Sequence, residues 1–83
     1  ASFERSQDNT LDLRGERADV AIARLEDFLG LAMELGEPEV HVIHGHGTGS
    51  VRKAVRGRLR DLGHVRRFAG GSLEQGGDGV TVV

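Results

Sequence analysis

Apolar and polar side chains alternate over a short stretch near the start of the chain. Leu11 and Leu13 are separated by Asp12 and followed by Arg14, and Gly15 ends the alternation. Successive side chains of a strand point to opposite faces of a sheet, so this stretch predicts a strand with both leucines toward the core. Asp12 and Arg14 then share the opposite face, away from the core.

Two longer segments carry apolar residues at three- and four-residue steps, which is the spacing of an amphipathic helix. The first segment spans residues 18–35 and is stopped by Gly36 and Pro38. The second spans residues 51–62 and is closed by Gly63. Thr48 or Ser50 is the expected N-cap of this second helix.

Short runs rich in β-branched residues predict the remaining strands, at residues 40–43, 64–69 and 80–83. The resulting order, strand, helix, strand, helix, strand, strand, predicts an α/β fold, a two-layer sandwich in which two helices cover a small mixed β-sheet. Residues 1–9 are polar and aperiodic and predict a disordered linker, so the folded domain is expected over residues 10–83.

The helix between the first two strands makes them parallel neighbours. In such sheets ligands bind outside the carboxyl ends of the strands. Here those ends bring Arg14 and Gly15 beside His44, Gly45 and His46. The sequence therefore predicts a cleft at this edge of the sheet.

Composition limits what the chain can be. It has 83 residues, of which 37% are hydrophobic and 4% aromatic, and it contains no cysteine. These values suit one small aliphatic core and exclude a disulfide framework, a zinc ribbon and a thiol nucleophile. No apolar run approaches the roughly 18 residues of a membrane span, and no signal pattern is present, so we expect a cytoplasmic domain that binds no membrane.

Charge is unevenly distributed along the chain. Residues 1–50 carry four basic and ten acidic side chains, whereas residues 51–83 carry seven basic and three acidic ones. Arg52, Lys53, Arg56 and Arg60 lie on the second predicted helix and could follow a nucleic-acid backbone. With so few aromatic residues, contact would be mainly to phosphates and largely independent of base sequence. The alternative is an ordinary solvated helix face.

The segment HGHGTGS at residues 44–50 lies just before the second helix, whose N-terminus carries a partial positive charge. Its backbone amides could hold a phosphate, and the residues expected to do so are Gly45, Gly47, Thr48, Gly49 and Ser50. The spacing fits neither a Walker A loop nor a GxGxxG motif. A purely structural tight turn is the alternative.

Four side chains near the predicted cleft could carry chemistry. His44 or His46 could act as general base or acid in phosphodiester cleavage, and Asp12 with Arg14 could supply a carboxylate and a phosphate clamp. The alternatives are histidines that only bond their own loop and a surface ion pair. Too few ligands are present for zinc, but a divalent cation such as Mg²⁺ or Mn²⁺ on Asp12 and water is compatible.

Three motifs, LDLRG at 11–15, IHGHGTGSVR at 43–52 and GGDGVTVV at 76–83, together resemble the Smr, or small MutS-related, domain. The resemblance is greatest to the version at the C-terminus of the second bacterial MutS paralogue. It implies a fold similar to the C-terminal domain of a bacterial translation initiation factor, and DNA nicking or, in other branches, RNA cleavage. Arg14 stands where many Smr branches have histidine, and His46 occupies a variable position, which makes His44 the better catalytic candidate.

The resemblance implies a DNA-nicking endonuclease module of low sequence specificity, attached to N-terminal MutS-like ATPase domains and acting in recombination and repair control. One alternative is a non-catalytic module that docks such an ATPase on branched DNA. Another is RNA binding or cleavage on ribosomes during rescue of stalled translation. A protein-interaction domain with an incidental basic face is the third.

Overall fold

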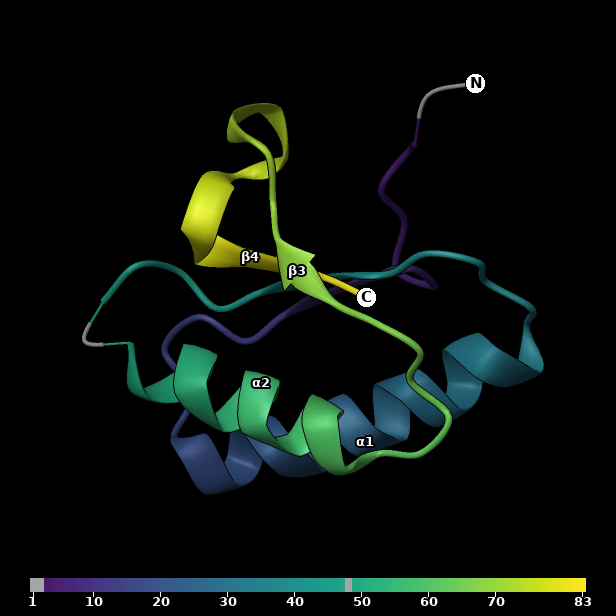
Figure 1. Cartoon of the computed structure of the whole chain (residues 1–83), viewed down its shortest axis with the longest axis horizontal. Coiled ribbons are helices and arrows are strands. Elements are labelled where there is room, and N and C mark those ends of the chain that lie inside the picture. The colour runs from purple at the N-terminus through teal and green to yellow at the C-terminus, as the bar shows by residue number, and fades with distance from the viewer. Residues whose placement is uncertain (1–2, 48) are drawn as a thin grey trace.

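Two helices cover one face of a four-stranded sheet in the part of the chain that the structure describes (Figure 1). The computed structural model describes residues 3–47 and 49–83. The strands are β1 (Thr10–Asp12), β2 (His41–Ile43), β3 (Ala69–Gly70) and β4 (Val80–Val82), and they lie in the order β1-β2-β4-β3. β1 and β2 are parallel, and the other two pairs are antiparallel. The predicted two-layer α/β fold with a small mixed sheet is confirmed.

Helix α1 (Ala18–Glu34) forms where the apolar spacing predicts it. Its buried side chains, at three- and four-residue steps, are those of Ala21, Leu25, Leu29 and Ala32. The helix is terminated by the C-cap Leu35 and by Gly36, which has a φ of +73°. The amide of Gly36 donates to the carbonyl of Met33, and that of Glu37 donates to the carbonyl of Ala32. This Schellman arrangement uses the left-handed conformation that glycine adopts without strain.

Helix α2 (Ser50–Asp61) packs against α1 with Val55 and Leu59 buried. Its N-cap is Gly49, with a φ of +82° and no side-chain capping bond, so the predicted capping role of Ser50 is wrong. Ser50 is instead the first residue of the helix. Thr48, the other predicted cap, lies outside the described residues.

The third predicted strand, residues 64–69, is wrong in extent. β3 contains only Ala69 and Gly70, which pair with Val82 and Thr81 of β4. Because the pairing is antiparallel, residues before 69 run past the end of β4. Val65 and Phe68 pack against the core without joining the ladder.

The described part of the predicted linker, residues 3–9, lies against the sheet. Asn9 is buried, and its carbonyl accepts a bond of 2.8 Å from the amide of His41. The Phe3 ring stacks on the His41 ring, with centroids 3.9 Å apart. Arg5 donates to Nδ1 of His41 and to the carbonyl of Gln75. These contacts cover the His41 side chain, which is 2% exposed.

The core lies between the sheet and the helices. Its buried members are Leu11, Leu13, Ala21, Leu25, Leu29, Ala32, Val40, Val42, Val55 and Leu59. Leu11 and Leu13 face this core, as their alternation with polar residues predicts. No helix in the described ranges has the length and hydrophobicity needed to cross a bilayer.

Leu25→Ala should lower the free energy of unfolding by about 2–5 kcal/mol, because it opens a cavity in a fully buried position. Leu31→Ala makes the same change on the same helix, where the side chain is 60% exposed, and should cost about 0.5 kcal/mol or less. Urea denaturation of the three proteins measures both. Equal losses would contradict the assignment of the buried face of α1.

Candidate functional site

A small cavity of about 150 Å³ opens where β2 leads into α2. Its lining consists of Gly15, His44, Gly45, Gly47, Gly49, Ser50, Val51 and Arg52. Gly15 lies three residues after the end of β1, and His44 directly follows β2. Because β1 and β2 are parallel neighbours, these two segments, which are distant in sequence, lie at the same edge of the sheet. The rest of the wall is formed by the glycines of segment 45–49, which we call the glycine loop, and by the first residues of α2.

Two loop glycines leave room for arginine side chains. A Cβ atom at Gly45 would lie 3.4 Å from Cγ of Arg14, and one at Gly49 would lie 3.0 Å from Nη2 of Arg52. Both glycines also have positive φ angles, which favour glycine over other residues. The loop is therefore flanked by the aliphatic part of the Arg14 side chain and by the guanidinium group of Arg52.

His44 is the first residue after β2, and its side chain belongs to a buried hydrogen-bond chain. Its Nε2 lies 2.7 Å from Oγ1 of Thr81, and its Nδ1 lies 3.1 Å from the carbonyl oxygen of Gly45. A carbonyl only accepts, so Nδ1 carries a hydrogen, and in the neutral ring Nε2 then accepts from the hydroxyl of Thr81. Nε of Arg56 in turn donates to Thr81 Oγ1 at 3.0 Å. Arg56, Thr81, His44 and Gly45 thus form one directed chain.

Burial lowers the pKa of His44 below its usual 6.5. The positive charges of Arg56 and Arg52 lower this pKa further, while the Gly45 carbonyl and the carboxylate of Asp78 act in the opposite direction. The imidazole is therefore neutral at pH 7. In this state one ring nitrogen donates and the other accepts, which gives the hydrogen-bond chain its direction.

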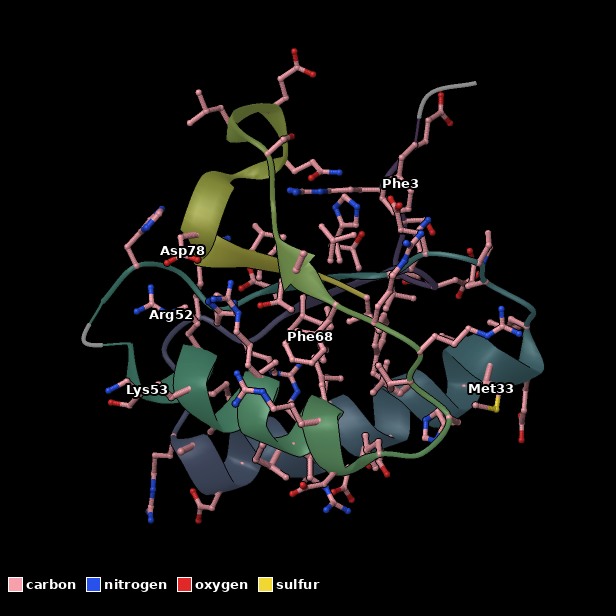
Figure 2. All side chains as sticks on the ribbon, viewed as in Figure 1. Phe3, Met33, Arg52, Lys53, Phe68 and Asp78 are labelled. Atoms are coloured by element: carbon pink, nitrogen blue, oxygen red, sulfur yellow. The ribbon has the colours of Figure 1, made fainter. Side chains whose placement is uncertain are left out.

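Asp78 completes the cluster around α2. Its Oδ2 lies 2.8 Å from Nη1 of Arg52, and its Oδ1 lies 3.0 Å from Nη2 of Arg56. The hydrogen bond from Arg56 is the main cause that lowers the pKa of Asp78 below 3.8. Figure 2 shows Arg52 and Asp78 facing each other at the end of the molecule that holds the glycine loop. Sequence reasoning missed Asp78, and its place between glycines just before the last strand was the available signal.

Asp12 and Arg14 form a surface ion pair, as the less specific interpretation held. Nη2 of Arg14 lies 2.6 Å from Oδ2 of Asp12, and the two side chains are 64% and 46% exposed. Neither residue lines the cavity. Asp12 pairs with Ile43, whose side chain points away from the face that Val42 and His44 share. The expected single pocket containing both Asp12 and His44 is therefore not what the structure shows.

The other predicted residues lie in separate places. His46 is exposed, with its ring beside Gly79: a Cβ atom there would lie 2.8 Å from Nε2 of His46. Lys53 is exposed and points away from the molecule (Figure 2). The Arg60 guanidinium lies 5.9 Å from the centre of the Phe68 ring, toward the far end of α2. Of the four basic residues predicted on α2, Arg52 and Arg56 lie near His44: Arg56 is linked to it through Thr81, and both arginines act on it by their charge.

A protein-held metal has little support in the arrangement of donors. Within residues 3–47 and 49–83 no three His, Asp or Glu side chains are grouped so as to hold a metal ion. The carboxylate of Asp12, the expected ligand, accepts bonds from Nε and Nη2 of Arg14. A cation there would have to compete with this guanidinium.

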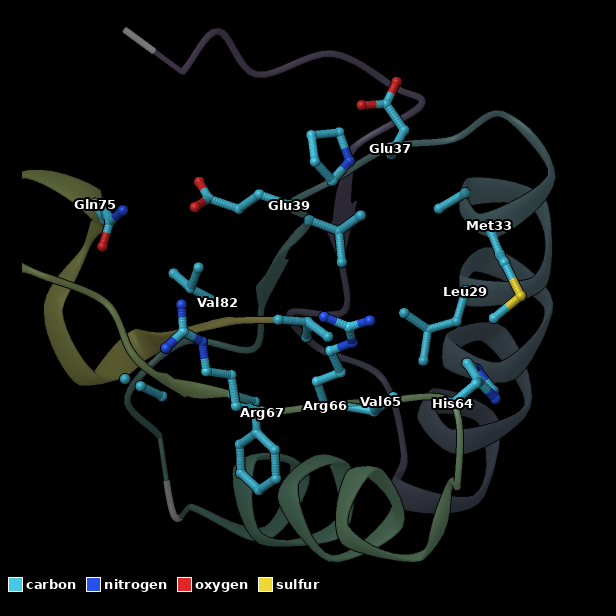
Figure 3. A pocket seen from close by; sticks show the side chains of 17 residues that line it. Leu29, Met33, Glu37, Glu39, His64, Val65, Arg66, Arg67, Gln75 and Val82 are labelled. Carbon is cyan, nitrogen blue, oxygen red and sulfur yellow. The ribbon is translucent and has the colours of Figure 1, made fainter.

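A second, larger groove of about 660 Å³ lies at the other end of the sheet (Figure 3). It runs between the C-terminal half of α1 and the segment 64–70, with Met33, Val40 and Arg67 among its walls. None of the residues predicted from the sequence as site residues lines it. The glycine-loop cavity is therefore the candidate site.

The lowered pKa of His44 predicts a pH dependence of stability. The folded state disfavours protonation of this ring, so the unfolded state binds more protons below pH 6.5, and the free energy of unfolding should fall as the pH drops below that value. Asp12 and Asp78, whose pKa values are lowered from 3.8, act only in a more acidic range. His44→Gln should flatten the slope between pH 7 and pH 5 in urea titrations. An unchanged slope would contradict the burial of a neutral His44.

Comparison with known proteins finds a matching family, similar sequences and similar solved structures. The Smr domain family matches residues 11–83. A protein named endonuclease MutS2 from Geobacillus sp. (strain WCH70) is 48% identical over 73 residues, which are 88% of this chain but 9% of that protein. The crystal structure of the Smr domain of Thermus thermophilus MutS2 superposes with a TM-score of 0.88 at 39% identity, covering 90% of this chain and 94% of that one.

A stand-alone small MutS-related protein from Escherichia coli, YdaL, shares the fold with a TM-score of 0.87 at 24% identity, covering 94% of this chain and 64% of that one. The match to the family extends from β1 to the end of β4 and includes the glycine loop and Asp78. The chain belongs to the Smr domain family and is homologous to the C-terminal region of MutS2 endonucleases.

Proposed function

We propose that this domain binds the nucleic-acid backbone at its glycine-loop end and nicks phosphodiester bonds in DNA with little sequence specificity. The observation that carries the proposal is the cavity in which loop glycines, the first turn of α2 and the Arg52 side chain meet. Backbone amides at a helix N-terminus and a guanidinium are the groups that bind phosphate in proteins. The name endonuclease carried by the MutS2 relatives supports the same reaction class.

Each residue at this end has a distinct role in the proposal. The loop holds the scissile phosphate, and Arg52 and Arg56 neutralise its charge. His44, whose ring nitrogens both have partners, positions Arg56 through Thr81. His46 is an exposed imidazole between Gly45 and Gly47, two glycines that line the cavity. In the proposal it takes a proton from the water whose oxygen bonds to phosphorus, and the sugar oxygen that leaves as the other P–O bond breaks takes a proton from solvent.

A second candidate function is binding without cleavage. It is favoured by the bonds that occupy both ring nitrogens of His44 and the carboxylate of Asp12. The chain spans 9% of the length of the Geobacillus relative, so MutS-like ATPase domains are plausible neighbours in a longer protein. In that case the domain would dock such an ATPase in the cytoplasm on DNA, including branched DNA, or on ribosomal RNA.

The two candidates separate in a nicking assay on supercoiled plasmid, run beside structured RNA and with Mg²⁺, Mn²⁺ or chelator. His46→Ala should slow nicking by about 100-fold or more, the usual contribution of a general base, while retaining DNA binding. His64→Ala removes an exposed histidine that follows the C-terminal end of α2 and lines the other groove, and it should leave nicking unchanged.

Full nicking by His46→Ala would contradict the role given to this residue. Binding by the wild-type domain without any nicking, under all metal conditions, would favour the second candidate. Fluorescence anisotropy with labelled DNA supplies the binding measurement. If about three phosphates are contacted, log affinity should fall with log salt at a slope of about −2.7 on duplex DNA.

A further inference from the structure

The carboxylate of Asp78 occupies the position that an anion would take between two arginines of the proposed interface. Its two oxygens each bind a different guanidinium, Oδ2 to Arg52 at 2.8 Å and Oδ1 to Arg56 at 3.0 Å. Two oxygens of one phosphodiester can be held by two guanidinium groups in the same way. The chain therefore places its own oxyanion in a site suited to a phosphate.

The arginines have support that does not depend on Asp78. Nε of Arg56 donates to the buried Thr81, so this side chain is held without the carboxylate. Arg52 is held by packing against the loop, where a Cβ atom at Gly49 would lie 3.0 Å from its Nη2. The side chains of Arg56 and Arg52 are 21% and 27% exposed, which limits how far they can move when the carboxylate leaves.

Asp78, by contrast, is free to turn outward. Its side chain is 58% exposed, so water can solvate the carboxylate once it is released. It lies in the short 3₁₀ turn Gly77–Gly79, between two glycines. Rotation of the side chain alone would open the space between the guanidinium groups, without a movement of β4.

We propose that Asp78 masks Arg52 and Arg56 in the free domain, and that a phosphate of the bound nucleic acid replaces its carboxylate. This inference rests on the proposed function, because it assumes that this end of the molecule meets the backbone. It adds a residue that limits affinity. In the free domain the two positive charges are partly neutralised, and contact with the backbone requires exchange of one anion for another.

Asp78→Asn tests the masking, since it removes the negative charge and keeps the shape of the side chain. Binding of a fluorescein-labelled DNA duplex, measured by anisotropy at low salt, should become about fivefold tighter, the effect expected from loss of one nearby competing charge. Asp61→Asn is the matched control. It makes the same change in net charge on α2, at an exposed residue for which the described structure has no ion pair.

A gain in affinity for Asp78→Asn that clearly exceeds the gain for Asp61→Asn supports masking. Equal gains would show that Asp78 contributes only net charge and would overturn the proposal. Weaker binding by Asp78→Asn would also overturn it, because the carboxylate would then be holding the arginines in place for the ligand.

A second measurement separates this inference from the proposed function. Inorganic phosphate is titrated into wild-type and Asp78→Asn proteins while the Nε–Hε signals of Arg52 and Arg56 are followed by NMR. Masking predicts shifts at these signals at several-fold lower phosphate concentration in the variant. If neither protein binds DNA, the proposed function fails and this titration still decides the masking. Identical titrations would overturn it.

Discussion

The hydrogen-bond chain from Arg56 through Thr81 to His44 joins the three elements that make up the candidate site. Arg56 comes from α2, Thr81 from β4 and His44 from the end of β2, so the contacts run through all three elements. Buried polar groups cost free energy unless each finds a partner, so this arrangement favours one relative placement of helix and sheet. The glycine loop begins at Gly45, the last member of this hydrogen-bond chain, so the chain fixes where the loop starts.

Local charge decides the chemistry of this site more than the net charge of −2 does. Burial, reinforced by two arginines on α2, lowers the pKa of His44, and the same arginines lower the pKa of the Asp78 carboxyl, so three kinds of ionisable group lie together. On the other face of the sheet, Arg14 neutralises Asp12 in a separate pair. The basic face of α2 is thus less positive than its own sequence indicates, because Asp78, 26 and 22 residues further along the chain, pairs with Arg52 and Arg56.

The sequence alone was sufficient to predict the features that depend on residues close together along the chain. The two helices and their glycine stops follow from local spacing, and the parallel pairing of β1 and β2 follows from the helix between them. The extent of β3 could not be predicted, because it is fixed by the register with β4 rather than by composition. The same holds for Asp78, whose partners are 26 and 22 residues away. Alternation along the first strand does predict the face of Asp12, but its separation from His44 depends on the register in which Asp12 pairs with Ile43.

The segment before β1, residues 3–9, packs on side chains of the folded domain. Phe3 lies flat on His41, and Arg5 bridges that ring to Gln75 near the opposite edge of the sheet. A fragment trimmed to Thr10 would keep every residue of the family match yet uncover an imidazole that is otherwise 2% exposed. The fragment would lose the Phe3–His41 stacking and both hydrogen bonds of Arg5, although all the motifs that define the family would be present in it.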